Sequence, residues 1–124
     1  MAHNYPIPDF MRDIANVEVS DNPVIIRSKS HDRCGVSPLL RQMLKGKTAD
    51  VVVTPRTLDE VCAVAKAAVH HRIPITPRGG GTANYGQSVP LQGGILLDMT
   101  AYSGVVLSFP PKTGPLFLET EGGC

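Results

Sequence analysis

The sequence predicts an α+β (α/β-like) fold: one incomplete strand–helix–strand lobe, preceded by short helices. A β-branched run at 50–55 is followed by a helical pattern over 57–72 and by a second extended segment at 73–76. This order is typical of a βαβ unit, whose crossover is right-handed in nearly all known cases. We divide the chain into a lead-in, residues 1–48, and the truncated lobe, residues 49–124.

Composition excludes several classes of function. The 124 residues carry 12 basic and 11 acidic side chains and no Trp, so we expect neither a basic stripe nor stacking platforms for nucleic acid. No apolar run reaches the roughly 20 residues of a transmembrane helix, and the N-terminus lacks a signal-peptide pattern. We therefore predict a cytoplasmic protein without a transmembrane segment.

The three cysteines are odd in number and far apart, without C-x-x-C spacing. Neither a disulfide framework nor a zinc site follows from them. We predict that Cys62 is a small core residue, because free cysteine is often buried.

The lead-in predicts two short helices. The first covers 10–15 with Asp9 as N-cap, and the second begins at Ser37 with a proline at its first position and ends at Gly46. The second helix has an apolar face of Leu39, Leu40, Met43 and Leu44. Segment 20–23 is a turn or a further helix start, and segment 27–35 is polar and irregular.

The helix of the lobe has a clear start signal. Thr57 and Glu60 have capping-box spacing, and the helix must end before Pro74. Its predicted buried face consists of Val61, Val64, Ala65, Ala68 and Val69. His70 and His71 lie in the last turn and point about 100° apart, so we predict no metal site there.

A run of three glycines, within 78–82, follows the second strand of the lobe. Successive backbone N–H groups in such a loop form a nest that suits an anion, usually phosphate, although a plain flexible turn is the alternative. A P-loop is excluded because segment 46–48 has Arg41 where the upstream glycine is required. A Rossmann fingerprint is excluded because Asn84 occupies its third glycine position. Arg78 is then either a phosphate partner or a salt-bridge residue.

Further strands are expected after the glycine loop. Segment 83–93 has turn formers and no helical period, and 94–99 is a strand. Segment 102–107 is strand or turn, and 116–120 begins one more strand. The sequence then stops without a covering helix or charged strand, which leaves an open sheet edge. We therefore expect a fragment of a larger domain.

Several segments in order resemble a known family. They are VVVTPRTLDEV at 51–61, IPITPRGGGT at 73–82 and GILLDMT at 94–100, with further similarity at 30–38 and 84–91. Together they resemble the start of a p-cresol methylhydroxylase-type FAD-binding domain of the vanillyl-alcohol oxidase superfamily. The similarity is to the branch of FAD-linked glycolate oxidase subunits and D-2-hydroxyacid (D-lactate) dehydrogenases, and it covers about residues 20–124.

The resemblance implies a site for FAD. The residues that would hold the FAD pyrophosphate and extend the binding turn are Pro77, Arg78, Gly79, Gly80, Gly81, Thr82, Ala83, Gly86 and Gln87. Segment 53–55 would lie on the adenine side. Some relatives attach the flavin to a histidine in or just after the glycine loop. Here Thr82 follows Gly81, so the resemblance implies non-covalent FAD.

The resemblance also implies an activity. A complete relative transfers a hydride from a 2-hydroxyacid, of the glycolate or D-lactate type, to FAD. This chain matches only the pyrophosphate-binding half and holds no residue matching the family's catalytic or substrate-binding part. We therefore expect it to be inactive alone and to bind FAD weakly or not at all, with the missing part supplied by a longer product or a second chain. The alternative is a stand-alone α/β module that binds a nucleotide or a protein without catalysis.

Overall fold

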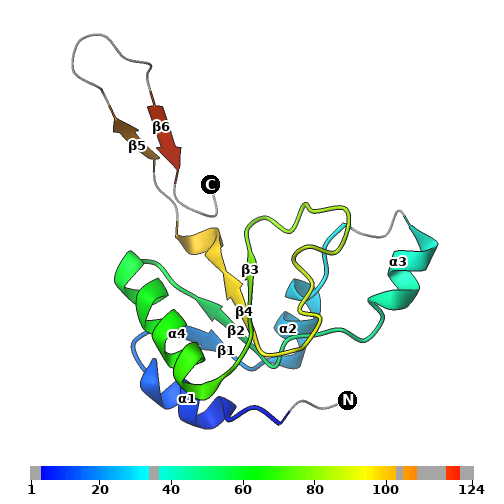
Figure 1. Cartoon of the computed structure of the whole chain (residues 1–124), viewed down its shortest axis with the longest axis horizontal. Helices are drawn as coiled ribbons and strands as arrows, with labels where there is room; N and C mark the ends of the chain where they lie inside the picture. The colour runs from blue at the N-terminus through cyan, green and yellow to red at the C-terminus, as the bar shows by residue number, and fades with distance from the viewer. Residues whose placement is uncertain (1–3, 34–36, 103–104, 109–116, 121–124) are drawn as a thin grey trace.

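The computed structural model describes residues 4–33, 37–102, 105–108 and 117–120 (Figure 1). Its elements in chain order are α1 (Ile7–Asp13), β1 (Glu18–Ser20), α2 (Pro23–Lys29), α3 (Pro38–Met43), β2 (Val51–Thr54), α4 (Leu58–His71), β3 (Ile75–Arg78), β4 (Ile95–Asp98), η2 (Met99–Ala101), β5 (Val105–Ser108) and β6 (Phe117–Thr120). None of the helices in these ranges is long and apolar enough to cross a membrane.

A four-stranded sheet with the order β1-β2-β4-β3 forms the centre of the fold. Strands β2 and β3 both pair in parallel with β4, and Ile95 of β4 is in register with Val51 on one side and Ile75 on the other. The predicted strand–helix–strand unit is therefore confirmed, with the third predicted strand inserted between the first two. β5 and β6 pair antiparallel in a separate two-stranded sheet, which confirms strands in both expected regions.

Alternate residues of the central strands are buried on opposite faces of the sheet. Val51, Val53 and Ile95 share a core with α1 and α4, whereas Val52 and Leu96 pack with Ala49 and with Ile26 of α2. Figure 1 shows α4 and α1 together on one side of the sheet and α2 apart from them. Burial on both faces explains why these strands are continuous apolar runs without polar alternation.

Helix α4 begins as its sequence predicts. The Thr57 hydroxyl accepts a hydrogen bond from the Glu60 amide at 3.2 Å, and the Glu60 carboxylate accepts from the Thr57 amide at 3.3 Å. The helix ends at His71, and its C-cap residue Arg72 has a φ of 55°, in the left-handed region. The capping box is therefore confirmed.

The buried face of α4 differs from the predicted one. Val64, Ala67 and Ala68 are buried, but Val69 is 78% exposed and Ala65 is exposed too. Cys62 is also exposed, so its prediction as a core residue was wrong. The cause is α1, which packs against α4 and shifts the buried stripe toward Ala67.

The lead-in differs from expectation at several points. α1 begins at Ile7 after Pro6, so Asp9 lies in the first turn, where it pairs with Arg12, and is not the N-cap. α2 extends through Lys29 into the segment predicted to be irregular, and Asn22 caps it by accepting from the Val24 amide at 2.9 Å. Strand β1 was not predicted, because three residues are too few to show an alternating pattern.

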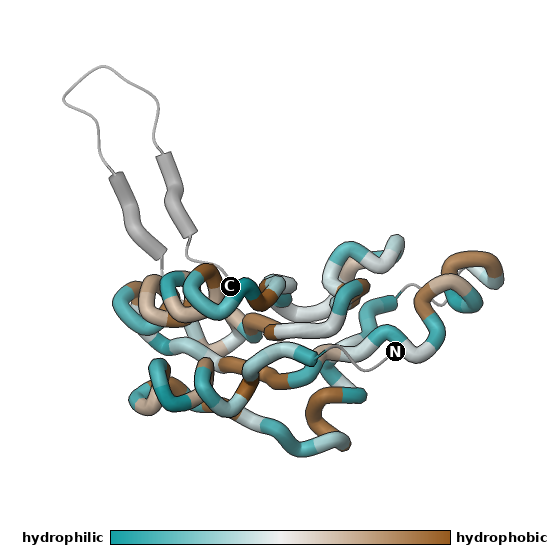
Figure 2. The backbone as a smooth tube through the Cα atoms, turned by 60° about the horizontal axis from the view of Figure 1, so that its bottom comes forward, coloured by the Kyte–Doolittle hydropathy of each residue, from teal (hydrophilic) through white to brown (hydrophobic). Residues whose placement is uncertain are grey.

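Helix α3 forms where predicted, with Ser37 as N-cap and Pro38 at its first position. Its apolar side chains are not a buried face: Leu39 is 66% and Met43 is 63% exposed. Figure 2 shows α3 at the outer end of the molecule, away from the central layers, with apolar residues along it. Leu40 and Leu44 are half-buried, and a methyl group of Leu44 packs against Gly86.

Gly94 forms the tight turn before β4. Its φ is +77°, and Asp50 holds the turn, because the Asp50 carboxylate accepts from the Gly94 amide at 2.6 Å. A Cβ atom on Gly94 would lie 2.4 Å from the Pro74 carbonyl oxygen. Gly46 has nearly the same φ, +76°, but its Cβ would have no neighbour within 4 Å.

Comparing alanine variants of these two glycines distinguishes the cost of backbone strain from the cost of a steric clash. Gly46→Ala is expected to lower the free energy of unfolding by about 1–2 kcal/mol, the cost of a side chain in the left-handed region. Gly94→Ala should cost about 2–4 kcal/mol, because crowding against Pro74 adds to the same strain. Equilibrium urea unfolding of both variants measures the difference, and equal losses would contradict the proposed clash.

Candidate functional site

The glycine loop lies at the carboxyl edge of the parallel strands. Arg78 is the last residue of β3 and stands in register with Asp98, the last residue of β4. The loop begins at Gly79, and Gly81 has a φ of +68°. Open α/β sheets bind their ligands outside the carboxyl ends of their strands, so the loop occupies the position where a ligand is expected.

A hollow of about 410 Å³ opens at this loop. The residues that line it are Pro77, Arg78, Gly79, Gly80, Gly81, Thr82, Ala83, Gln87 and Ser88. The structure thus brings together all the residues expected to hold FAD except Gly86, and it adds Ser88. Ser88 was missed because a serine among turn formers gives no pattern that marks it as buried.

Arg78 lies directly over the glycine loop. A Cβ atom on Gly81 would lie 1.8 Å from a guanidinium nitrogen of Arg78, so only glycine leaves room for this arrangement. The Arg78 Nε is buried and has no hydrogen-bond partner in the structure. In the part of the chain that the structure describes, Arg78 forms no ion pair, so the salt-bridge alternative finds no partner there.

The backbone of the loop also offers free donors. Among the described residues, the amides of Gly80, Gly81 and Thr82 donate no hydrogen bond to another backbone group. Together with the buried Nε of Arg78, they are groups that an incoming acceptor can satisfy. The arrangement suits an anion with several oxygens, such as a phosphate.

Residues of the lead-in contact the segment that follows the three glycines. The Arg33 amide donates to the Ala83 carbonyl at 2.9 Å. Gly86, whose φ is +82°, packs so closely on Leu44 that a Cβ atom there would lie 2.6 Å from a Leu44 methyl carbon. Gly86 does not line the hollow, and its observed contact is this packing against the lead-in.

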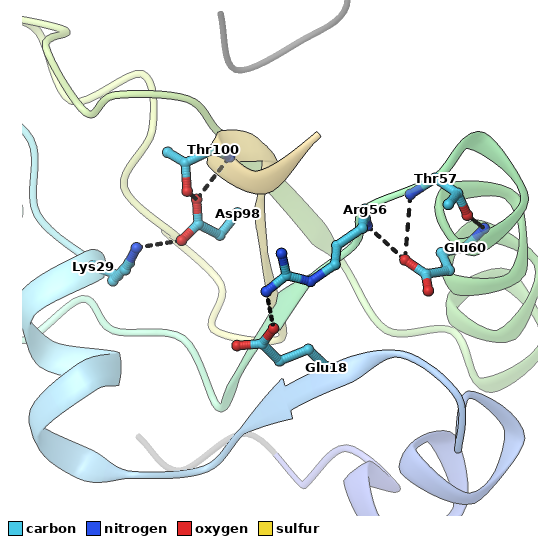
Figure 3. A network of polar contacts seen from close by, with 7 residues as sticks. All are labelled: Glu18, Lys29, Arg56, Thr57, Glu60, Asp98 and Thr100. Carbon is cyan, nitrogen blue, oxygen red and sulfur yellow. Dashed lines mark hydrogen bonds and ion pairs between the residues drawn. The ribbon is translucent and has the colours of Figure 1, made fainter. Parts of the chain in front are cut away.

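A buried carboxylate stands beside the site, at the end of β4 (Figure 3). The side chain of Asp98 is 2% exposed and pairs with Lys29 of α2. Its other oxygen accepts from the Thr100 amide at 3.1 Å and from the Thr100 hydroxyl at 2.7 Å. Burial raises the pKa of Asp98, but hydrogen bonds from Lys29 and Thr100 outweigh burial, so the net pKa lies below its ordinary value.

A second network follows β2 at the same edge (Figure 3). Arg56 donates to the Glu18 carboxylate of β1 at 2.8 Å, and its backbone amide donates to Glu60 of α4. These exposed contacts join β1, β2 and the start of α4. Exposed ion pairs contribute little free energy, so their main effect is on the orientation of Arg56.

The two adjacent histidines take different partners. His71 Nε2 lies 2.7 Å from the Asp13 carboxylate of α1, and the His70 and His71 rings meet edge to face at 4.8 Å. Among the residues that the structure describes, no group of three or more His, Cys, Asp or Glu side chains lies close enough together to hold a metal ion.

The fold is an α/β lobe whose glycine loop lies at the carboxyl edge of three parallel strands, where sheets of this kind bind their ligands. The model of the FAD binding domain family matches residues 49–119, more than half of the chain. The chain therefore belongs to the FAD binding domain family, and FAD is the cofactor of that family. The resemblance inferred from the sequence is confirmed.

Curated relatives match short stretches of the chain. A probable mitochondrial D-lactate dehydrogenase of Danio rerio is 46% identical over 57 residues, 46% of this chain and 12% of that protein. The glycolate oxidase subunit GlcD of Bacillus subtilis is 42% identical over 48 residues, 39% of this chain and 10% of that protein. D-2-hydroxyglutarate dehydrogenase of Escherichia coli is 37% identical over 77 residues, 60% of this chain and 7% of that protein. The chain thus spans about a tenth of the length of these relatives.

Solved structures show the same fold at lower identity. An alkyldihydroxyacetonephosphate synthase aligns with a TM-score of 0.66 and 20% identity over 80% of this chain and 21% of the other. A substrate-bound p-cresol methylhydroxylase aligns with a TM-score of 0.61 and 20% identity over 81% of this chain and 19% of the other. These similarities confirm the predicted fold, that of a p-cresol methylhydroxylase-type FAD-binding domain.

The Asp98–Lys29 pair predicts a pH-dependent effect on stability. Lys29→Met should lower the free energy of unfolding at pH 7 by about 1–3 kcal/mol, discounted because the ammonium group is partly in water. The pKa of Asp98 is lowered by folding, so its contribution is complete above its unfolded pKa and is lost as pH falls through the folded value. The difference in the free energy of unfolding between wild type and variant should therefore become smaller below about pH 4.

Urea unfolding at pH 7 and pH 3 checks this expectation, with Lys47→Met, a change at an exposed lysine, as control. If Lys29→Met lowers the free energy of unfolding by the same amount at both pH values, Lys29 does not act on the ionised carboxylate of Asp98.

Proposed function

We propose that this chain is the FAD-binding portion of a flavin-dependent oxidoreductase and that the hollow after β3 holds the FAD pyrophosphate. The observation that supports this most directly is that Arg78 lines the hollow while its buried Nε lacks a hydrogen-bond partner. A buried donor without an acceptor is costly, and a phosphate oxygen would satisfy it.

The chemistry of the lining fits a pyrophosphate. The lining residues include an arginine, a threonine, a serine and a glutamine, but no carboxylate that would repel an anion. Gly81 leaves space that a Cβ would fill, so backbone and guanidinium can approach the phosphates together. The residues proposed to bind FAD are Pro77, Arg78, Gly79, Gly80, Gly81, Thr82, Ala83 and Gln87, with Gly86 holding the turn.

We propose that FAD is held without a covalent bond. The residues that line the hollow include no histidine, cysteine or tyrosine that would attach to a flavin. When bound, the flavin supplies a ring that accepts a hydride, and this chain contributes binding and orientation of the dinucleotide.

The proposed substrate class is a 2-hydroxyacid of the glycolate or D-lactate type. It is supported by three relatives that are named as D-lactate dehydrogenase, glycolate oxidase subunit and D-2-hydroxyglutarate dehydrogenase. We propose that the substrate and catalytic residues lie outside residues 1–124, in a longer product or a second chain. We also propose that the protein acts in the cytoplasm and that residues 49–124 form the amino-terminal part of the FAD-binding domain.

Ligand titration tests the cofactor site. Isothermal titration of the purified chain should show weak binding of FAD and ADP, with a Kd of about 0.1–1 mM. Riboflavin, which lacks the pyrophosphate, should not bind. Gly81→Ala should abolish binding, because its Cβ would displace the Arg78 guanidinium. Gly46→Ala provides a matched control, since it adds a methyl group at a similar φ far from crowding atoms.

Two results would contradict the proposed site. Equal affinity for riboflavin and ADP would mean that the pyrophosphate is not the group recognised. Unchanged ADP binding by a folded Gly81→Ala variant would place the ligand away from the glycine loop.

The substrate class is tested on the full product of the gene. With FAD bound, it should reduce an electron-acceptor dye in the presence of D-lactate, glycolate or D-2-hydroxyglutarate. Dye reduction with none of these three substrates would contradict the proposed class.

A further inference from the structure

We propose that Ser88 is a ligand-positioning residue whose hydroxyl donates a hydrogen bond to a phosphate oxygen of the dinucleotide in the hollow. This inference rests on the proposed function and extends it to a residue that neither the glycine motif nor the family resemblance singled out. It stands on the burial of Ser88, the lack of a partner for its Oγ, and its place in the wall of the hollow.

The Ser88 hydroxyl is both buried and unpartnered. The residue is 8% exposed, and its Oγ has no hydrogen-bond partner in the structure. Burying a hydroxyl without a partner is unfavourable, so such groups are rare and need an explanation. A ligand acceptor that reaches Oγ provides one.

The backbone holds Ser88 in a defined position. The Val89 amide donates to the Gly86 carbonyl at 3.1 Å, which closes the turn that contains Ser88. Val89, the residue after Ser88, is 3% exposed, so its burial anchors the end of this turn. A side chain on such a turn loses little conformational freedom when a ligand binds, which favours a role in positioning.

Two residues that line the hollow, Arg78 and Ser88, each carry a buried polar atom without a hydrogen-bond partner. Arg78 Nε comes from the end of β3, and Ser88 Oγ comes from the turn ten residues later. Gln87 also lines the hollow, but its Oε1 already accepts from the Tyr85 amide at 3.0 Å. Arg78 Nε can only donate, and a hydroxyl can donate as well, so a single acceptor-rich anion satisfies both. A pyrophosphate has enough oxygens to do this.

The chain offers a matched serine as control. Ser30 is also buried, at 0% exposed, but its Oγ accepts a hydrogen bond from the Ala49 amide at 3.0 Å. Removal of the Ser30 hydroxyl leaves that amide without its acceptor, whereas removal of the Ser88 hydroxyl leaves no protein group unpaired. The two Ser→Ala variants should therefore have opposite effects on stability and on ligand binding.

The experiment compares Ser88→Ala and Ser30→Ala with wild type, each by thermal unfolding without ligand and by calorimetric titration with ADP. Ser88→Ala should keep or raise the Tm and weaken ADP binding about tenfold, as expected for loss of one hydrogen bond to a charged acceptor. Ser30→Ala should lower the Tm and leave the ADP Kd of the folded protein unchanged.

The possible failures are distinguishable. A Tm loss in Ser88→Ala as large as that in Ser30→Ala would show that the hydroxyl has a structural partner, and would overturn the inference without reference to a ligand. Unchanged ADP affinity in Ser88→Ala, with wild-type binding intact, would overturn the inference and leave the proposed FAD site standing. Absence of ADP and FAD binding by the wild-type chain would overturn both.

Discussion

The structure depends on the burial of β4 between β2 and β3. Ile95 and Leu96 are fully buried, and each neighbouring strand takes its register from this one strand. Because all three strands are parallel, their carboxyl ends meet at one edge of the sheet. This register brings Arg56, Arg78 and Asp98 to the same edge, although they are far apart in the sequence.

The polar groups near that edge differ in whether they have a hydrogen-bond partner. Asp98 is fully paired through Lys29 and Thr100, so it stabilises the end of β4 and links α2 to the sheet. Arg78 Nε and Ser88 Oγ are buried without partners, and both residues line one hollow. Native proteins rarely leave buried polar groups unpaired, and sites that receive a ligand are a known exception. Asp98 therefore holds the fold, whereas the unpaired groups of Arg78 and Ser88 are those that we propose to bind the ligand.

Local signals in the sequence were sufficient for much of the fold. The capping box at Thr57 and Glu60, the apolar strand runs and the glycine loop each depend on residues close together in the chain, and each is observed. The sequence-based predictions were wrong or incomplete where contacts between segments far apart in the chain decide burial or strand formation. α1 shifts the buried stripe of α4, which leaves Val69 and Cys62 exposed, and the edge strand β1 exists through its pairing with β2.

The candidate site divides in the same way. The sequence by itself determined the glycine loop, its place after a strand, and the family with its FAD cofactor, because steric freedom and motif order are properties of neighbouring residues. Only the tertiary structure decided that Gly86 packs against the lead-in, that Arg78 lies over Gly81, and that Ser88 is buried in the wall of the hollow. Burial and hydrogen-bond pairing depend on which segments contact one another in the folded protein, and the spacing of residues along the chain does not determine those contacts.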